Sequence, residues 1–107
     1  MTDIISVDLS NFDSSYLTSV KKLFLGCTSL KLVNFSNFNT EKISDMSSMF
    51  SGCTSLKYLD ISSFNMGKVD NTENMFEGIQ ELNYINLDGI KYFDKSIVEN
   101  NLNTISG

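Results

Sequence analysis

The sequence predicts an α/β solenoid built from about four units of 26 residues. Three observations lead to this prediction. Residues of one kind recur every 26 positions, as Phe24, Phe50 and Phe76 do. Each unit contains a stretch that alternates apolar and polar residues, which is typical of a half-buried strand. Each also contains a stretch with apolar residues at helical spacing. Such units bury their apolar faces only by stacking on their neighbours.

The repeat covers nearly the whole chain. Residues 24–49 and 50–75 share 12 identities in 26 positions. Four columns of equivalent apolar residues extend the period in both directions: Ile4, Leu30, Leu56 and Leu82; Val7, Val33, Leu59 and Ile85; Leu9, Phe35, Ile61 and Leu87; and Phe12, Phe38, Phe64 and Ile90. We predict one domain over residues 1–107, with units at about 4–29, 30–55, 56–81 and 82–107. The end units carry polar substitutions, such as Lys95 and Asn101, that are typical of caps.

The expected strands lie in the alternating part of each unit. The stretch "LKYLDIS" alternates at Leu59, Asp60, Ile61 and Ser62. Stacked at the strand spacing of about 4.8 Å, four such stretches would form one parallel sheet on the concave side of the solenoid.

The expected helices lie in the other half of each unit. In "KISDMSSMFSGC" the apolar residues are Ile43, Met46, Met49, Phe50 and Cys53, a spacing that fits one face of a short helix or 3₁₀ segment. Residues suited to a helix N-cap precede these stretches at Thr18, Ser44, Asp70 and Ser96. Glycines suited to a left-handed C′ position follow them at Gly26, Gly52 and Gly78. We therefore predict short helical segments on the convex side.

The composition excludes several classes of function. The chain has 107 residues, a net charge of −5 and no His, Arg, Pro, Trp or Ala. Without His it lacks the usual general base and the commonest zinc ligand, and without Arg it lacks bidentate phosphate clamps. Nonspecific nucleic-acid binding requires cationic side chains. Since nothing singles out a nucleophile with a positioned base, we expect no enzyme, catalytic residue, metal site, cofactor or direct nucleic-acid contact.

The sequence also bears on localisation. No apolar run is long enough to span a bilayer. The start, "MTDIISVDLS", has neither the basic region nor the apolar region of a signal peptide. We expect a cytoplasmic protein if Met1 is the natural start, and a cell-surface or secreted one if the chain is a segment of a longer protein. The dominance of Lys, Asn, Ile, Phe and Ser is typical of an AT-rich genome.

The segment "MFSGCTSLKYLDISSFN", preceded by "ISDMSSMF", resembles the BspA-like leucine-rich repeats. These repeats are known from bacterial surface proteins, mycoplasma lipoproteins and some protist surface proteins. The resemblance is specific over residues 24–66 and weaker at both ends. It implies a right-handed leucine-rich-repeat solenoid that works by adhesion or protein binding and has no catalytic residues.

The outward positions of the expected strands are the candidate binding site. An apolar or aromatic column would lie beside a column of Asp and Asn on an extended concave surface, where solenoids commonly bind partners. Tyrosine offers a large contact area with a polar tip, as interfaces require. The residues are Leu32, Asn34, Tyr58, Asp60, Tyr84, Asn86 and Asp88. The alternative is a half-solvated sheet whose tyrosines merely pack across strands.

Two further functions remain open. A small acidic protein from a phage or mobile element could mimic nucleic-acid charge against a basic host protein, using Asp70, Glu73, Glu77 and Glu81. Acids at a helix N-terminus also explain part of this cluster without a function. The third hypothesis is a self-assembling structural element, because the N-terminal unit has little chain to cover it and an open edge invites pairing with another copy.

The remaining distinctive residues are predicted to fill the core. Cys27 and Cys53 occupy equivalent positions where the third unit has Ile79, so stacked thiols are favoured over a disulfide. Methionines fall largely at positions that are apolar in other units: Met46, Met49, Met66 and Met75. The phenylalanines from Phe12 to Phe64 are expected to form a stacked spine.

Overall fold

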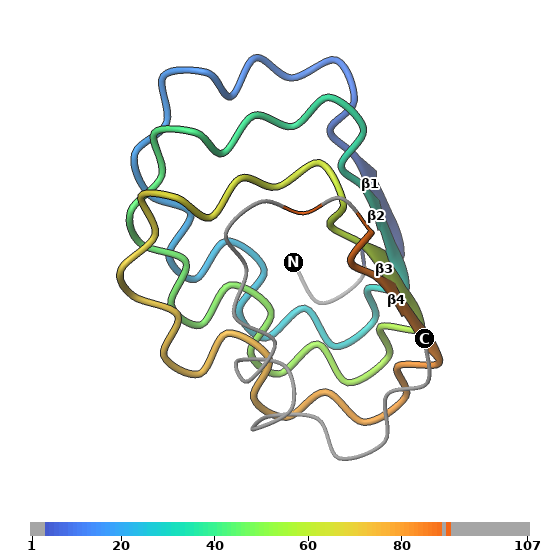
Figure 1. Cartoon of the computed structure of the whole chain (residues 1–107). Helices are drawn as coiled ribbons and strands as arrows, with labels where there is room; N and C mark the ends of the chain where they lie inside the picture. The colour runs from blue at the N-terminus through green and yellow to red at the C-terminus, as the bar shows by residue number, and fades with distance from the viewer. Residues whose placement is uncertain (1–3, 89, 91–107) are drawn as a thin grey trace.

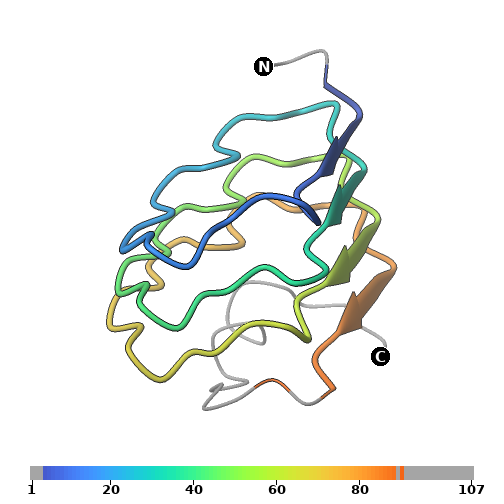
Figure 2. The same cartoon turned by 90° about the horizontal axis from the view of Figure 1, so that it is seen from above.

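The computed structural model describes residues 4–88 and 90, and the chain forms four short strands within this part. The strands are β1 (Ser6–Asp8), β2 (Leu32–Asn34), β3 (Tyr58–Asp60) and β4 (Tyr84–Asn86). They lie side by side in chain order and point the same way (Figures 1 and 2). Most of the predicted fourth unit, with Ser96, Lys95 and Asn101, lies outside the described residues.

The strands form two separate two-stranded sheets instead of the single sheet that was predicted. β1 pairs with β2 and β3 pairs with β4, both in parallel. Both pairs keep the 26-residue register, since Val7 lies opposite Val33 and Leu59 opposite Ile85. β2 and β3 are neighbours, but no ladder joins them in the described part of the chain.

The predicted helical and 3₁₀ segments are also wrong. Residues 4–88 and 90 contain no helix of either kind, and so none that could cross a membrane. The expected caps Thr18, Ser44 and Asp70 instead link successive units, because the Ser44 N–H donates to the Thr18 carbonyl and the Asp70 N–H to the Ser44 carbonyl, each at 2.9 Å. Because the described residues form two short sheets and no helix, the predicted leucine-rich-repeat solenoid with helical segments is wrong.

Consecutive turns replace the expected helices because some residues adopt a left-handed backbone. Lys22, Ser48 and Asn74 have φ of 60, 55 and 58°, and four residues later Gly26, Gly52 and Gly78 have φ of 72, 78 and 82°. A right-handed helix cannot pass through such residues. The predicted left-handed glycines are present, but they follow turns and not helices.

The backbone hydrogen bonds of these turns alternate between two directions. The N–H groups of Leu23, Leu25 and Cys27 each donate three residues back, at 3.1 Å. The N–H groups between them donate to the next unit, as from Phe24 to the Met49 carbonyl at 2.9 Å and from Gly26 to the Ser51 carbonyl at 2.8 Å. Every second N–H is thus available to hold neighbouring units together, which a helix would not allow.

Three polar corners shape each of the first three units, and the described part of the fourth unit contains the first of them. At each corner a side-chain oxygen accepts the N–H of the residue two positions later, which closes an Asx or Ser turn. The first corner uses Asp8, Asn34, Asp60 and Asn86; the second uses Asp13, Asn39 and Asn65; the third uses Ser19, Asp45 and Asn71. These turns explain structurally why Asp, Asn and Ser recur with the same 26-residue period.

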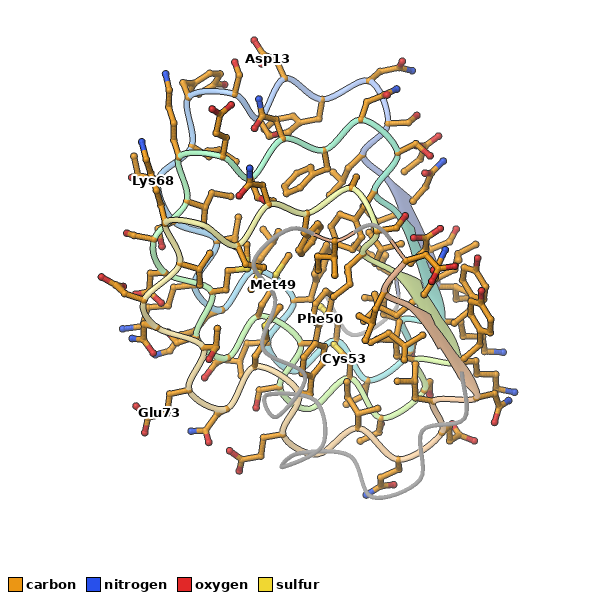
Figure 3. All side chains as sticks on the ribbon, in the orientation of Figure 1. Asp13, Met49, Phe50, Cys53, Lys68 and Glu73 are labelled. Atoms are coloured by element: carbon orange, nitrogen blue, oxygen red, sulfur yellow. The ribbon has the colours of Figure 1, made fainter. Side chains whose placement is uncertain are left out.

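The core runs between the units. Phe50 stacks on Phe24 and Phe76, with ring centroids 5.8 and 5.7 Å apart, and Phe38 contacts Phe64 at 6.0 Å. Figure 3 shows Met49, Phe50 and Cys53 inside the molecule, whereas Asp13, Lys68 and Glu73 point away from it. The four predicted core methionines are all buried. Their burial confirms that they belong to the core.

Two buried hydroxyl groups join successive units at the second corner. The Thr40 hydroxyl donates to the Asn65 carbonyl at 2.8 Å and accepts the Asn65 N–H at 2.6 Å. Ser14 makes the same pair of bonds with Asn39, at 3.0 and 2.7 Å. Each hydroxyl therefore satisfies both backbone groups of a residue in the next unit, which burial requires.

The first unit leaves apolar side chains exposed that are buried in the second. Ile4 is 38 % exposed and Phe12 45 %, whereas the equivalent Leu30 and Phe38 are 0 and 2 % exposed. Phe12 is thus outside the predicted phenylalanine spine. Within residues 4–88 and 90, the carbonyls at positions 19, 21, 23 and 25 receive no hydrogen bond, although their equivalents at 45, 47, 49 and 51 all do. This side of the first unit is called the N-terminal edge below.

Candidate binding surface on the strands

The strands place alternate side chains on the inside and outside of the molecule. Val33, Leu59 and Ile85 point inward and are buried. Leu32, Tyr58 and Tyr84 start their strands and point outward, with 43, 41 and 41 % of their surface exposed. The strand face, as the name is used below, is the outward surface of β2, β3 and β4. A column of three large exposed side chains on one side of a small protein is the kind of patch that partners cover.

The two tyrosines lie parallel. The rings of Tyr58 and Tyr84 are stacked, with centroids 4.8 Å apart and planes 4° from parallel. Partial desolvation, followed by the charge of Asp60 and the neighbouring Tyr84, raises the pKa of Tyr58. The Tyr58 phenol therefore remains a hydrogen-bond donor at neutral pH. The parallel register of β3 and β4 fixes this pair, since Tyr58 lies directly opposite Tyr84.

The predicted Asp and Asn column has a structural role that sequence reasoning missed. Asn34 and Asn86 accept the N–H groups of Ser36 and Asp88, each at 2.9 Å, in the Asx turns of the first corner. Asp60 accepts both the N–H and the hydroxyl of Ser62, at 3.0 and 2.6 Å. The predicted site residues thus lie on one surface. In each of the three corner residues, however, one side-chain oxygen already accepts the hydrogen bond that closes the turn.

Asp60 is charged although it is partly buried. Burial, the largest single effect, raises its pKa, but hydrogen bonds from Ser62 and from the Asn86 side chain together outweigh it, so the pKa of Asp60 lies below the usual value. The exposed Asp8, at the equivalent position in the first unit, has its pKa lowered by hydrogen bonds from Ser10. Asp60 therefore presents a carboxylate, not a carboxylic acid, on the strand face near neutral pH.

A furrow runs along the strand face where β2 and β3 lie side by side without a ladder. Its first part has a volume of about 310 Å³. The lining residues come from both strands and the turns after them: Leu32, Val33, Asn34, Phe35, Ser36, Tyr58, Asp60, Ser62 and Ser63. Two further hollows continue it between the second and third units, through Asn37–Glu41 and Ser62–Asn65 and then to Lys68. The furrow is open to solvent along the strand face and around the second corner.

Two local irregularities accompany the furrow. Phe35 occupies a position that holds Leu9, Ile61 or Leu87 in the other units, and its ring packs 5.1 Å from that of Phe64. Asn37 has φ of 66°, whereas no such value occurs at the equivalent Asn11 or Ser63. Extra side-chain volume in a packed core shifts the backbone around it. The bulk of Phe35 in an otherwise Leu/Ile column was the available sequence signal for this break.

The acidic patch predicted as an alternative site is exposed. Asp70, Glu73, Glu77 and Glu81 all lie on the surface. Because the third unit has no helix, the helix-dipole explanation of this cluster is wrong. The Glu73 N–H donates to the Asn71 side chain at 3.1 Å, which fixes its backbone at the third corner.

The two cysteines are free thiols in the core. Cys27 and Cys53 are 1 and 0 % exposed, and the Cys53 thiol lies 3.2 Å from the Phe24 carbonyl. Burial, with a smaller effect of Cys27, raises the pKa of Cys53 to about 12, and burial also raises that of Cys27. Neither thiol is a reactive nucleophile at neutral pH. In residues 4–88 and 90, no group of three or more His, Cys, Asp or Glu side chains is placed to hold a metal ion.

Comparison with known proteins identifies a family. No curated protein and no solved structure matches the chain. A family model described as "Mycoplasma protein of unknown function, DUF285" matches residues 1–106. Since this match covers nearly the entire sequence, the chain belongs to the DUF285 family of Mycoplasma proteins.

Proposed function

We propose that this protein binds another protein through the strand face and catalyses no reaction. The observation that carries the proposal is the exposed column of Leu32, Tyr58 and Tyr84, in which the pairing of β3 with β4 holds the two tyrosines in register. Stacked tyrosines form a rigid apolar surface with hydroxyl groups at its rim, and such aromatic anchors dominate the energetics of many interfaces. The adjacent furrow adds backbone and side-chain polar groups for a partner to contact.

The sequence supports the same proposal independently. Residues 24–66 resemble BspA-like repeats, and that resemblance implies adhesion or protein binding. The partner-facing set is the one the sequence predicts: Leu32, Asn34, Tyr58, Asp60, Tyr84, Asn86 and Asp88. In this set the three large side chains supply contact area, and the polar ones set the orientation of the partner.

Selection of peptides from a random display library tests the proposal. The wild-type protein is the target, and selected peptides are then measured against Tyr58→Ser/Tyr84→Ser. The control variant is Tyr16→Ser/Leu25→Ser, which removes two large exposed side chains, 65 and 48 % exposed, away from the strands. We expect at least about a tenfold loss of affinity in the tyrosine variant, as for interface anchors, and little change in the control.

The proposal is wrong if the selected peptides bind both variants equally well. The selected peptides could instead lose affinity when Glu73 and Glu77 are replaced, and bind much more weakly as the salt concentration rises. That result would favour the acidic-inhibitor hypothesis.

A second candidate function is self-association through the N-terminal edge. The specific observation is the exposure of Ile4, Phe12 and Leu23, at 38, 45 and 37 %, although Leu30, Phe38 and Met49 are buried at the equivalent positions. An uncovered apolar layer beside backbone carbonyls without donors is suited to a second copy of the chain.

A further inference from the structure

The Tyr58 side chain lines the furrow. One face of its ring stacks on Tyr84, which belongs to β4 on the other side of β3. Leu32, from β2, lines the same furrow as Tyr58. The part of the furrow that Leu32, Tyr58 and Asp60 line together, called the slot below, thus has an apolar, an aromatic and an acidic side chain in its wall.

The electrostatics of the slot favour a cation. Asp60 is charged at neutral pH and is the acidic residue of the furrow wall beside Tyr58. No lysine lines this first part of the furrow. The face of an aromatic ring is the negative end of its quadrupole, so a cation placed over it is attracted. The whole chain carries a net charge of −5, which adds to the attraction.

We propose that this slot takes the guanidinium group of an arginine on an extended segment of the partner protein. A guanidinium is flat, stacks on aromatic rings and pairs with carboxylates, whereas a lysine ammonium group is compact and strongly hydrated. The group packs against the exposed Tyr58 and Leu32 side chains and donates hydrogen bonds to Asp60. This inference rests on the proposed protein binding by the strand face and names the chemistry that the partner must present.

An extended segment fits the furrow better than a helix does. From the slot, the furrow passes through Asn37–Glu41 and Ser62–Asn65 and reaches Lys68, always between the second and third units. Its lining is rich in Asn, Ser and Thr, which can bond to the backbone of a peptide. Most of the length of the furrow therefore holds the backbone of the partner's extended segment, and the slot selects one side chain of that segment.

A titration with defined peptides tests this proposal. The probe is a capped pentapeptide with a central arginine flanked by threonine and serine, and its control replaces arginine with neutral, equally flat citrulline. Binding is followed by ¹⁵N NMR shifts of the full chain. We expect the arginine peptide to bind about fivefold tighter than the citrulline peptide, as one cation–π contact and one exposed ion pair allow. The shifts should centre on Asn34, Tyr58, Asp60 and Ser62.

Asp60→Asn is the matched variant. Asn34 and Asn86 close the same Asx turn at the equivalent positions, so the change removes charge and keeps the fold. We expect this variant to bind the arginine and citrulline peptides equally.

Equal affinity of the two peptides for the wild type, or unchanged arginine preference in Asp60→Asn, would overturn the proposal. So would shifts confined to residues away from the strand face. In these cases protein binding by the strand face would still stand, provided that display-selected peptides depend on Tyr58 and Tyr84. Loss of that dependence would contradict the proposed function itself.

Discussion

Individual polar residues hold the units of this chain together. Asn and Asp side chains close the corners, and the hydroxyls of Ser14 and Thr40 each satisfy a donor and an acceptor in the next unit. Each such buried hydrogen bond adds only modestly to the net stability. Removing just one of its two partners is costly, because the other group then stays buried without a partner. Polar residues therefore set the shape of this protein as much as its phenylalanines do.

Thr40 provides a direct test at this scale. Thr40→Val keeps the side-chain shape but leaves the Asn65 N–H and carbonyl without a partner, so we expect the free energy of unfolding to fall by about 2–4 kcal/mol. Thr40→Ser keeps the hydroxyl, as Ser14 does in the first unit, and should lose much less. Urea unfolding followed by circular dichroism measures both. Equal losses in the two variants would show that the hydroxyl bonds are unimportant.

The corner carboxylates predict how stability depends on pH. Hydrogen bonds from Ser10, Ser15 and Ser47 lower the pKa values of Asp8, Asp13 and Asp45 below the ordinary 3.8. A carboxylate with a lowered folded-state pKa stabilises the protein above its unfolded pKa, and this contribution is lost as the pH falls through the folded value. We therefore expect the urea midpoint to drop below about pH 4.

A triple variant isolates this effect. Asp8→Asn/Asp13→Asn/Asp45→Asn keeps the turns, because Asn closes them at Asn34, Asn39 and Asn71. Its urea midpoint should fall less between pH 5 and pH 2.5 (a range chosen to span about one unit either side of the ordinary carboxyl pKa). An unchanged acid sensitivity would mean that other carboxylates are responsible.

At the scale of elements, the sequence predicts the strands well and the turns poorly. The alternating stretches do form β1 to β4, but the stretch from Ile43 to Cys53 forms consecutive turns and not a helix. Both structures bring apolar residues three or four positions apart to one side, so spacing alone cannot separate them. The helix-disfavouring signal was the frequent Ser, Asp and Gly residues of this stretch, which suit turns and positive φ.

The substitution Ser48→Gly distinguishes a helix from consecutive turns, because its effect on the free energy of unfolding has the opposite sign in the two structures. In a helix, Ser48→Gly would lower stability by about 0.5 kcal/mol. At its φ of 55°, glycine relieves backbone strain, so we expect the free energy of unfolding to rise by up to about 1 kcal/mol. Ser51→Gly is the control, because Ser51 does not have a positive φ and should lose stability. A loss in both variants would support a helix.

The break between β2 and β3 also belongs to this scale. The repeat predicts one continuous sheet, because equivalent residues recur in every unit. Phe35 and the left-handed Asn37 depart from the repeat and coincide with the furrow. The outward column Leu32, Tyr58 and Tyr84 could be predicted from alternation, whereas the furrow could not, since it depends on how neighbouring units deviate from one another.

At the scale of the whole molecule, the N-terminal edge predicts self-association. Light scattering over a concentration series should show a rising molar mass for the wild type. Phe12→Asp/Leu23→Lys places charges on the edge and should keep the chain monomeric. Dimers that survive this change would rule out this edge as the interface.

The most direct test of the strand face measures binding and stability in the same variant. Tyr58→Ser/Tyr84→Ser is compared with the wild type for urea unfolding and for affinity to the display-selected peptides. We predict a nearly unchanged urea midpoint with a loss of affinity of at least about tenfold, because the exposed tyrosines serve a partner. A large drop in the urea midpoint with unchanged affinity per folded molecule would contradict this account. It would show that the two rings stabilise the paired strands and do not form a binding surface.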